Sequence, residues 1–280
     1  MVAVTTAAFL GPLISLAWFA FHSALYSYVL VIPAVSLYFA WQRKDDVLAS
    51  GGQTRNLVWW PLGAGIGLLL WYGSARLCGE QWATQDYLAL TISAWLLLVG
   101  AICIWLFDTE RLRALVFPLG FLVFMVPLPT IAEAQLETLL QHGSALAAQF
   151  FFTLAGTTVF VDGLVFQLPN ITLQIAPECS GIHSSLALFI TSIIAGYIFL
   201  QSPGRRTVLA LAVLPLALAR NGLRVFVIGE LCVRLGPELI NSYIHRHGCP
   251  LFFVLSLIPF FILLVILVKS EKKPKTGLRH

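Results

Sequence analysis

PLFFVLSLIPFFILLVILV, residues Pro250–Val268, carries no charged side chain and is followed directly by Lys269. About 20 consecutive apolar residues in an α-helix cross the roughly 30 Å hydrocarbon core of a bilayer. A charge-free stretch of this length that ends at a basic residue therefore predicts a transmembrane helix.

Further stretches of similar length and with little or no charge recur along the chain. They are Val4–Phe21, Ser23–Trp41, Leu57–Ala75, Tyr87–Phe107, Ala114–Ala132, Gly181–Leu200 and Thr207–Leu231. The first two follow each other almost directly, so they predict either a tight helical hairpin or a re-entrant pair. Together with Pro250–Val268, the pattern predicts an all-α membrane protein, a polytopic bundle of about eight transmembrane helices.

The composition supports this class. Hydrophobic residues make up 59% of the chain and charged residues only 11%, whereas a soluble domain carries about 25% charged residues. The net charge of +4 does not indicate nucleic-acid binding, because five of the 17 basic residues lie in the tail, residues 269–280. The remaining basic residues form no stripe that alternates with aromatic residues. The expected surroundings are a lipid bilayer, with no nucleic-acid partner.

The basic residues also predict the orientation. Twelve lie in one set of alternate connections and only three, Arg76, Arg234 and Arg246, lie in the other set. Because loops rich in Lys and Arg stay in the cytoplasm, the first set is expected inside and both termini with it. The chain is therefore predicted to be one membrane-embedded domain, residues 1–280, that spans the membrane several times and has a cytoplasmic tail at 269–280.

The longest outer connection, Glu133–Cys179, is predicted to be structured. Its apolar residues from Leu136 to Phe151 recur at helical spacing, which predicts an amphipathic helix at the outer interface. Thr157–Ile175 contains an Asp-Gly turn signal and a stretch of alternating apolar and polar residues, which predicts a small β-hairpin. This subregion leads to Cys179 and the sixth span.

The predicted topology brings three chemically different side chains to one depth on the outer side. Cys179 lies at the outer end of the sixth span, and His245 and His247 precede the last span. Arg224 follows Thr207, at the cytoplasmic end of its span, by 17 residues. In an α-helix this places it about 26 Å into the membrane, near the outer boundary. In acyl transfer a thiolate is the nucleophile, an imidazole moves protons, and a guanidinium stabilises the oxyanion. A position in the first turn of a helix would lower the pKa of the Cys179 thiol.

Several residues leave alternatives open. His183 is a second candidate for the base, and Arg220 either pairs with Glu230 or caps carbonyl groups of another helix. Among the other cysteines, Cys103 and Cys232 are expected to be packing residues, and Cys78 and Cys249 are both expected outside, where a disulfide between them is open. The five cysteines are scattered without a C-x-x-C pair, so no metal site and no cofactor are expected.

A different function class remains as the main alternative. Arginine within a membrane span is costly, so Arg220 and Arg224 also fit an intramembrane anion site of a transporter or channel. Transporters are typically built from internal repeats, and no repeat is visible in this sequence. A non-catalytic scaffold for exported or lipid-linked partners is a further alternative, which would not depend on Cys179, Arg224 or His245.

Three short motifs in fixed order resemble the exosortase/archaeosortase family. They are Cys179-Ser180-Gly181-Ile182 at the start of a span, Asn221-Gly222-Leu223-Arg224 in the next, and His245 before the last. The resemblance extends to Gly156-x-x-Val159-x-x-x-Gly163 with the strand Leu168–Ile175, and to Tyr26–Lys44 near the N-terminus. It covers most of the chain and is clearest from Gly156 to Phe261.

The resemblance implies a multispanning cysteine transpeptidase of a bacterial inner membrane, with its active site on the periplasmic face. Such enzymes process exported proteins whose C-terminal sorting signal (PEP-CTERM-like) has a Pro-Glu-Pro-type motif, a transmembrane helix and a basic tail. They pass the acyl group to an acceptor nucleophile, whose identity the sequence does not reveal. By motif, Cys179 is the nucleophile, Arg224 the transition-state stabiliser and His245 the general acid/base, with His247 as the alternative. The supporting residues are Glu178, Ser180, Gly181 and Asn221. The family often has arginine where this chain has His183.

Overall fold

The computed structural model describes residues 1–44, 58–79, 81–107, 109–169, 171–175, 180–236 and 243–272, without the side chains of 109–111, 243–250 and 272. The chain divides into two compact units, Met1–Glu133 and Ala134–His280. Each unit has its own set of packed helices, and the helix α8 begins in the first unit and continues into the second. The single domain predicted for residues 1–280 stays a prediction.

The first unit is built from helices of unequal length. They are α1 (Val2–Ala8), α2 (Leu10–His22), the 3-10 turn η1 (Ser27–Leu30), α3 (Ile32–Gln42), α5 (Trp59–Leu77), α6 (Thr84–Leu106), α7 (Thr109–Phe121) and the 3-10 turn η3 (Leu122–Met125). The first predicted span is broken, because α1 and α2 meet at an angle of 66°. The fifth predicted span, Ala114–Ala132, is broken too: η3 ends at Met125 and α8 (Thr130–Ala155) begins after an irregular stretch.

Buried polar groups hold the end of the first unit together. The hydroxyl of Tyr26, a residue only 1% exposed, donates to the Glu133 carboxylate at 2.7 Å. The side-chain amide of Gln85 donates to the same carboxylate and, at 2.6 Å, to the carbonyl of Leu128. Because a buried polar group without a partner is costly, these bonds favour one conformation of the chain at the start of α8.

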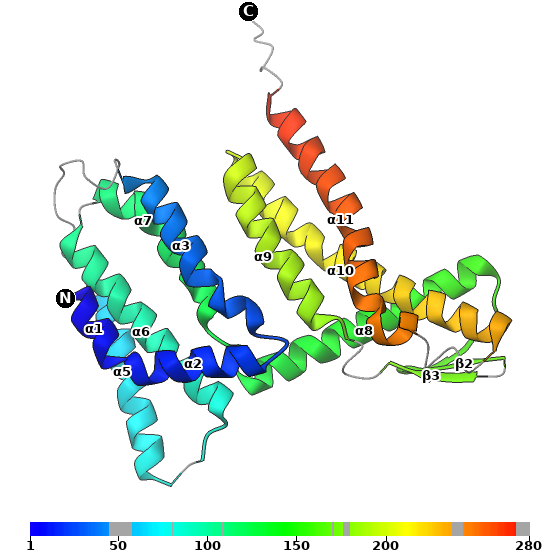
Figure 1. The fold of residues 1–280 in the computed structure, drawn as a ribbon, viewed down its shortest axis with the longest axis horizontal. Coiled ribbons are helices and arrows are strands. Elements are labelled where there is room, and N and C mark those ends of the chain that lie inside the picture. The colour runs from blue at the N-terminus through cyan, green and yellow to red at the C-terminus, as the bar shows by residue number, and fades with distance from the viewer. Residues whose placement is uncertain are drawn as a thin grey trace, which may run out of the picture. The chain divides into compact units, whose positions relative to one another are not determined.

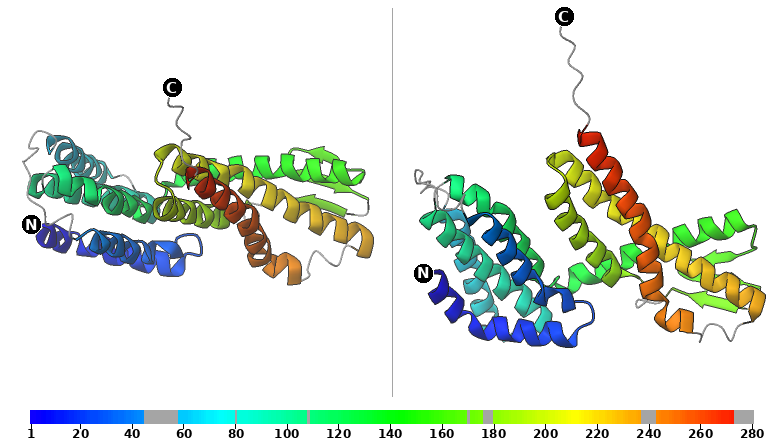
Figure 2. Two further views of the ribbon diagram at one scale, coloured as in Figure 1. Left: turned by 90° about the horizontal axis from the view of Figure 1, so that it is seen from above. Right: turned by 45° about the horizontal axis from the view of Figure 1, so that its top comes forward.

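The second unit contains a helical layer and a small sheet. Its helices are the main part of α8, α9 (Ile182–Phe199), α10 (Pro203–Leu235) and α11 (Tyr243–Lys272). The last three lie side by side (Figures 1 and 2), with Leu188, Leu209 and Phe260 fully buried between them. The eighth predicted span, Pro250–Val268, thus lies within a helix that begins earlier, at Tyr243.

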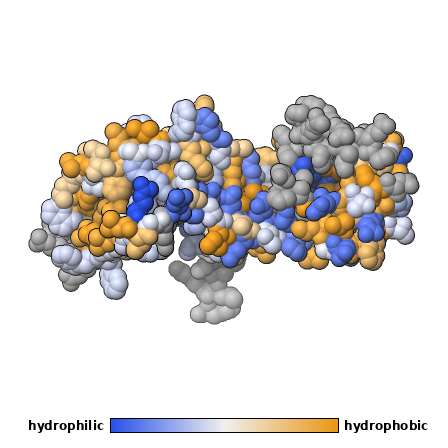
Figure 3. All heavy atoms as spheres, turned by 90° about the horizontal axis from the view of Figure 1, so that it is seen from below, coloured by the Kyte–Doolittle hydropathy of each residue, from blue (hydrophilic) through white to orange (hydrophobic). Residues whose placement is uncertain are grey.

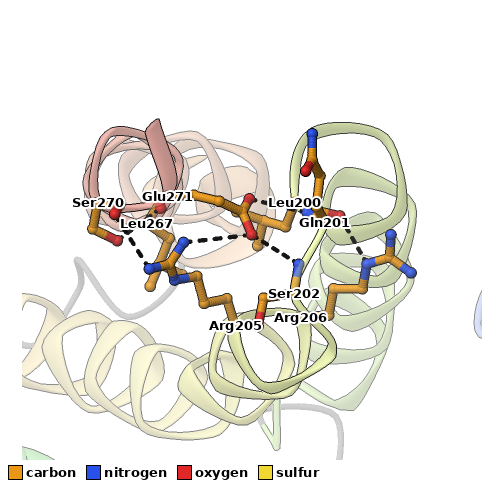
Figure 4. Close-up of polar contacts among 8 residues, drawn as sticks. All are labelled: Leu200, Gln201, Ser202, Arg205, Arg206, Leu267, Ser270 and Glu271. Carbon is orange, nitrogen blue, oxygen red and sulfur yellow. Dashed lines mark hydrogen bonds and ion pairs between the residues drawn. The ribbon is translucent and has the colours of Figure 1, made fainter. Parts of the chain in front are cut away.

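The connection between α9 and α10 is tied to the far end of α11 by Glu271 (Figure 4). Its carboxylate accepts the backbone N–H groups of Gln201 at 3.0 Å and Ser202 at 2.8 Å, and it forms an ion pair with Arg205 at 3.4 Å. Arg206 donates to the carbonyl of Leu200 at 2.8 Å. Amides at the beginning of a helix have no partner within that helix, so Glu271 supplies acceptors where α10 begins.

The sheet has three antiparallel strands in the order β1 (Phe160–Asp162), β2 (Val165–Leu168) and β3 (Ile171–Gln174). The prediction of a hairpin in Thr157–Ile175 is confirmed and extended by one strand. The Asp-Gly signal is the turn between β1 and β2, where Gly163 has a φ of +60°. One face of the sheet packs on α8 and α10 through Phe166, Leu173 and Ile175.

The helix α8 agrees in part with the predicted amphipathic helix. It buries Leu140, Ser144, Ala148 and Phe152 within the second unit. Other apolar residues of the predicted stripe remain exposed, namely Leu139, Leu146 and Phe150. The buried side chains recur every three or four residues, as expected for one helix face. The apolar pattern therefore predicted the helix correctly, but not which residues it buries.

The apolar surface fits a multi-pass membrane protein. Among the described residues, four helices are long and apolar enough to span a bilayer: α6, α9, α10 and the part Leu251–Glu271 of α11. The number rises to as many as six if each of two bent helix pairs counts as one span. Large apolar side chains lie on the surface, among them Trp18, Leu211 and Ile262, and Figure 3 shows wide apolar areas on the face it presents. The predicted count of eight spans stays a prediction.

Candidate active site

Four residues of the predicted site lie together in the second unit, where α9 begins beside the middle of α10. They are Ser180, Gly181, Asn221 and Arg224. Cys179 and Glu178 lie outside the described residues. His245 and His247 lie in the first turns of α11, ahead of its candidate membrane-spanning part Leu251–Glu271, and their side chains are not among those described.

Gly181 defines the start of α9. It is the N-cap residue and has a left-handed backbone, with φ of +74°, a conformation that glycine adopts without strain. A Cβ atom at this position would lie 3.2 Å from Nη2 of Arg220 and 3.3 Å from Oδ1 of Asn221. The helix proper begins at Ile182. The predicted position of Cys179 in the first turn concerns a residue outside the described part of the chain, so it stays a prediction.

Ser180, the residue directly after Cys179, is held from two helices. Its carbonyl accepts a hydrogen bond from Nδ2 of Asn221 at 3.3 Å, and Nδ2 also donates to Oγ of Ser144 at 2.9 Å. The Ser180 hydroxyl donates to Oε1 of Glu137 at 3.4 Å. Ser180 is 2% and Asn221 3% exposed. Since these bonds are buried, they fix the chain where it leaves Cys179.

The sequence prediction missed Glu137 and Ser144. The two residues are seven positions apart on α8, so they lie on the same helix face. Polar residues at that spacing within an apolar stretch are a signal that could have identified them. The partner of Glu137 is Ser180, just before α9, and that of Ser144 is Asn221 on α10, which the spacing alone does not reveal.

Arg220 contacts the first turn of α9. Its Nη2 donates to Oγ of Ser185 at 3.2 Å and to the carbonyl of Gly181 at 3.4 Å. Glu230 instead pairs with Arg234 at 2.9 Å and accepts a hydrogen bond from Thr157. Of the two roles left open for Arg220, the structure shows the contact with a carbonyl group of another helix. Its charge lies next to the turn that follows Cys179.

Arg224 lies one helical turn further along α10, in different surroundings. It is only 8% exposed and lines a cavity of about 40 Å³ at the end of β3. The other lining residues are Leu173, Gln174, Ile175, Asn221, Val225 and Ile228. The space is sufficient for a small polar group. A guanidinium stays protonated at physiological pH, so the cavity has a permanent positive charge in its wall.

The remaining candidate residues, His183 and the other cysteines, are not part of this cluster as far as the structure describes them. His183 is exposed in the first turn of α9. Cys103 and Cys232 are buried free thiols, as expected for packing residues, and Cys78 is an exposed free thiol. The side chain of Cys249 lies outside the described part of the chain, so the Cys78–Cys249 disulfide stays an open alternative. In the part of the chain that the structure describes, no cluster of His, Cys, Asp and Glu has the size needed to hold a metal ion.

Close packing of α8 on α10 positions the cluster. A Cβ atom at Gly222 would lie 2.5 Å from Cβ of Ala147 and 2.8 Å from the backbone nitrogen of Ala148. A Cβ atom at Gly229 would likewise lie 2.6 Å from Cζ of the Phe152 ring. Because these neighbours include backbone atoms, they cannot move without moving the helix. Glycine at 222 thus brings Asn221 within reach of Ser144.

Gly222→Ala is expected to destabilise the protein by about 1–3 kcal/mol, since the added methyl group forces α8 and α10 apart. Thermal denaturation in detergent, followed by the loss of monodisperse protein, measures the effect. Gly67→Ala in α5 is the matched control, because a Cβ atom there meets nothing within 4 Å, and alanine in a helix is favoured over glycine by about 0.5–1 kcal/mol. Equal thermal stability of the two variants would contradict the packing described here.

The comparison with known protein families agrees with the motifs and the fold. The profile of the transmembrane exosortase family matches residues 18–262, a range that includes most of each unit and every residue of the candidate site. No curated protein and no solved structure matches the chain. Since the matched range covers most of the 280 residues, the chain belongs to the transmembrane exosortase family.

Proposed function

We propose that this exosortase is a cysteine peptidase and transpeptidase that cleaves the C-terminal sorting signal of exported proteins through a thioester on Cys179. One observation carries the proposal. Arg224 and Asn221 are neighbours on one turn of α10, where the buried Arg224 lines a small cavity and Asn221 holds the residue after Cys179. A cation can stabilise the oxyanion of acyl transfer, and an anchored segment can hold the nucleophile in position for the attack.

In the proposed reaction the Cys179 thiolate attacks the scissile carbonyl carbon, and negative charge develops on the carbonyl oxygen. Arg224 stabilises this oxyanion. The C–N bond then breaks, and His245, or His247 in its place, protonates the leaving amine. An acceptor nucleophile (water, a lipid amine or a sugar hydroxyl) attacks the thioester and gives up a proton. The Cys179 thiol is released, and the product is a free carboxylate, an amide or an ester.

The proposed setting is a bacterial inner membrane, with both termini in the cytoplasm and the active site on the periplasmic face. The distribution of basic residues supports this orientation. Glu178 is proposed to orient its neighbours, and Ser180, Gly181 and Asn221 to position the nucleophile. The partners are exported proteins with a Pro-Glu-Pro-type motif, a transmembrane helix and a basic tail.

The alternative of an anion transporter is less consistent with the surroundings of the two arginines. Arg220 donates hydrogen bonds to Gly181 and Ser185, so part of its guanidinium already binds protein groups. An anion site within a transporter typically uses unwound helices at mid-membrane. In contrast, α10 is one helix from Pro203 to Leu235.

Trapping of the thioester tests the proposal. The exosortase is incubated in membranes with an exported reporter that has a Pro-Glu-Pro-type motif, a transmembrane helix and a basic tail. Hydroxylamine, a strong nucleophile toward thioesters, is expected to convert the new C-terminus of the reporter into a hydroxamate, which mass spectrometry identifies. A product that contains only a free carboxylate at every hydroxylamine concentration would contradict a thioester intermediate. No cleavage of the reporter in any condition would count against the proposed substrate class.

A further inference from the structure

β3 is an edge strand of the three-stranded sheet. It pairs with β2 on one side, from Leu168 opposite Ile171 to Val165 opposite Gln174. On its other side the structure shows no paired strand within the described residues. An unpaired edge presents a row of backbone donors and acceptors to which another chain can add.

The register shows which backbone groups face this edge. The N–H of Ile175 donates to the carbonyl of Leu164 at 3.0 Å, so Ile175 bonds toward β2. Antiparallel strands alternate between bonded and non-bonded residues, and Leu173 and Ile171 therefore face β2 as well. The N–H and carbonyl groups of Thr172 and Gln174 point to the open side. No backbone bond of these groups is formed with any described residue.

The side chains of β3 alternate in the same way. Leu173 and Ile175 are buried against α8 and α10, whereas Thr172 and Gln174 are exposed. The strand is thus anchored through one face and accessible at its edge. Such an anchored edge resembles the edges to which extended peptides add as a further strand in peptide-binding domains.

The edge leads directly to the candidate active site. Gln174 and Ile175, at the end of β3, line the cavity with Arg224, and Gln174 precedes Cys179 by five positions. A peptide that runs along β3 therefore has one end at the buried guanidinium. The scissile carbonyl of such a peptide would then lie next to the Arg224 guanidinium.

We infer that β3 binds the extended segment of the exported substrate next to its cleavage site, as a fourth strand of the sheet. This inference rests on the proposed function, because it names where that substrate is held. The backbone groups of Thr172 and Gln174 supply the hydrogen bonds. Affinity from backbone groups depends little on the substrate's side chains, so one edge serves different exported proteins.

A Pro-Glu-Pro-type segment can pair with β3 in only one of the two alternating arrangements of its backbone groups. Alternate residues of a strand direct their backbone groups to the same side, and proline has no N–H group. Prolines two positions apart therefore point away from β3, where no donor is needed. The residue between them directs its N–H and carbonyl groups to the edge.

Photo-crosslinking tests the inference without catalysis. In full-length protein with the substitution Cys179→Ala, benzoylphenylalanine at Thr172 is expected to crosslink to the reporter next to its cleavage site. The control places it at Phe160, an exposed position on the opposite edge strand β1, where little or no crosslinking is expected. Equal crosslinking from both edges, or none from Thr172, would overturn the inference.

The rate of processing supplies the second measurement. Thr172→Pro removes the outward N–H of β3 and leaves the bonds to β2 in place, so cleavage is expected to slow by about threefold to tenfold through a higher KM. Val161→Pro is the matched control, because Val161 pairs with Phe166 and its backbone groups face outward from β1. Its rate is expected to stay at the wild-type value, and a loss of rate equal to that of Thr172→Pro would overturn the inference.

The two measurements separate this inference from the proposed function. If the reporter crosslinks at Thr172 but the wild-type protein does not cleave it, the result would support substrate binding at β3 and contradict the proposed peptidase function. Cleavage that yields the hydroxamate, but without crosslinking at Thr172 and with a normal rate for Thr172→Pro, would support the peptidase and reject β3 as the binding edge.

Discussion

Replacing Cys179 with alanine is expected to lower the rate of reporter cleavage by on the order of 10⁴-fold or more, as in other enzymes that lose a covalent nucleophile. The reason is chemical: a methyl group cannot form the thioester, and hydrolysis without it depends only on the remaining groups of the site. A gel shift of the reporter in membranes, quantified over time, measures the rate. The hydroxamate product should disappear together with cleavage.

Cys78→Ala is the control for this substitution. Cys78 is an exposed free thiol in the first unit, and its replacement is expected to leave the cleavage rate within about a factor of two, as for most surface substitutions. Wild-type cleavage by a Cys179→Ala protein that is folded and inserted would remove the thiol from the mechanism. The transporter alternative for Arg220 and Arg224 would then become the leading hypothesis.

Substitution of Arg224 by glutamine is expected to reduce kcat by about 10²–10³-fold with little change in KM. This is the typical loss for a donor that stabilises an oxyanion. Because Arg224 is buried next to Asn221, its charge is only weakly screened by water. Arg224→Lys retains the charge but not the planar donor geometry, so its kcat is expected between those of the wild type and the glutamine variant.

Arg234→Gln is the matched control on the same helix. Its side chain is 74% exposed and forms an ion pair with Glu230, and exposed pairs contribute little to stability. Wild-type kinetics are therefore expected. An Arg224→Gln variant that is stable and monodisperse, with an unchanged kcat and a raised KM, would indicate a role in substrate binding and contradict oxyanion stabilisation.

Much of the secondary structure was predictable from local sequence patterns. The charge-free stretches lie largely in helices, two of them broken, and the Asp162–Gly163 signal is the turn between two strands of a small sheet. The breaks after Ala8 and Met125 were not visible, because an apolar stretch has the same composition whether its helix is straight or broken. Hydropathy measures how well a segment partitions into lipid, and it contains no information on helix direction.

The candidate site was predictable only in part. Cys179 and Arg224 were predicted because the inferred topology puts a thiol, an imidazole and a guanidinium at one depth, and because arginine within a span is costly. The contacts of Asn221 with Ser144 and Ser180 join α10 to α8 and to the segment before α9, and no spacing within one segment encodes such contacts. The unpaired edge of β3 was not predictable either, since it depends on the spatial order of the strands in the sheet.

The bonds from Glu271 to the amides of Gln201 and Ser202 have a consequence for biosynthesis. The ribosome makes the turn between α9 and α10 about 70 residues before it makes this carboxylate. While the membrane takes up α9 and α10, the two amides therefore have to bind water or the insertion machinery. The turn acquires its final partners only after α11 has been delivered, so translation order delays the completion of this helical layer.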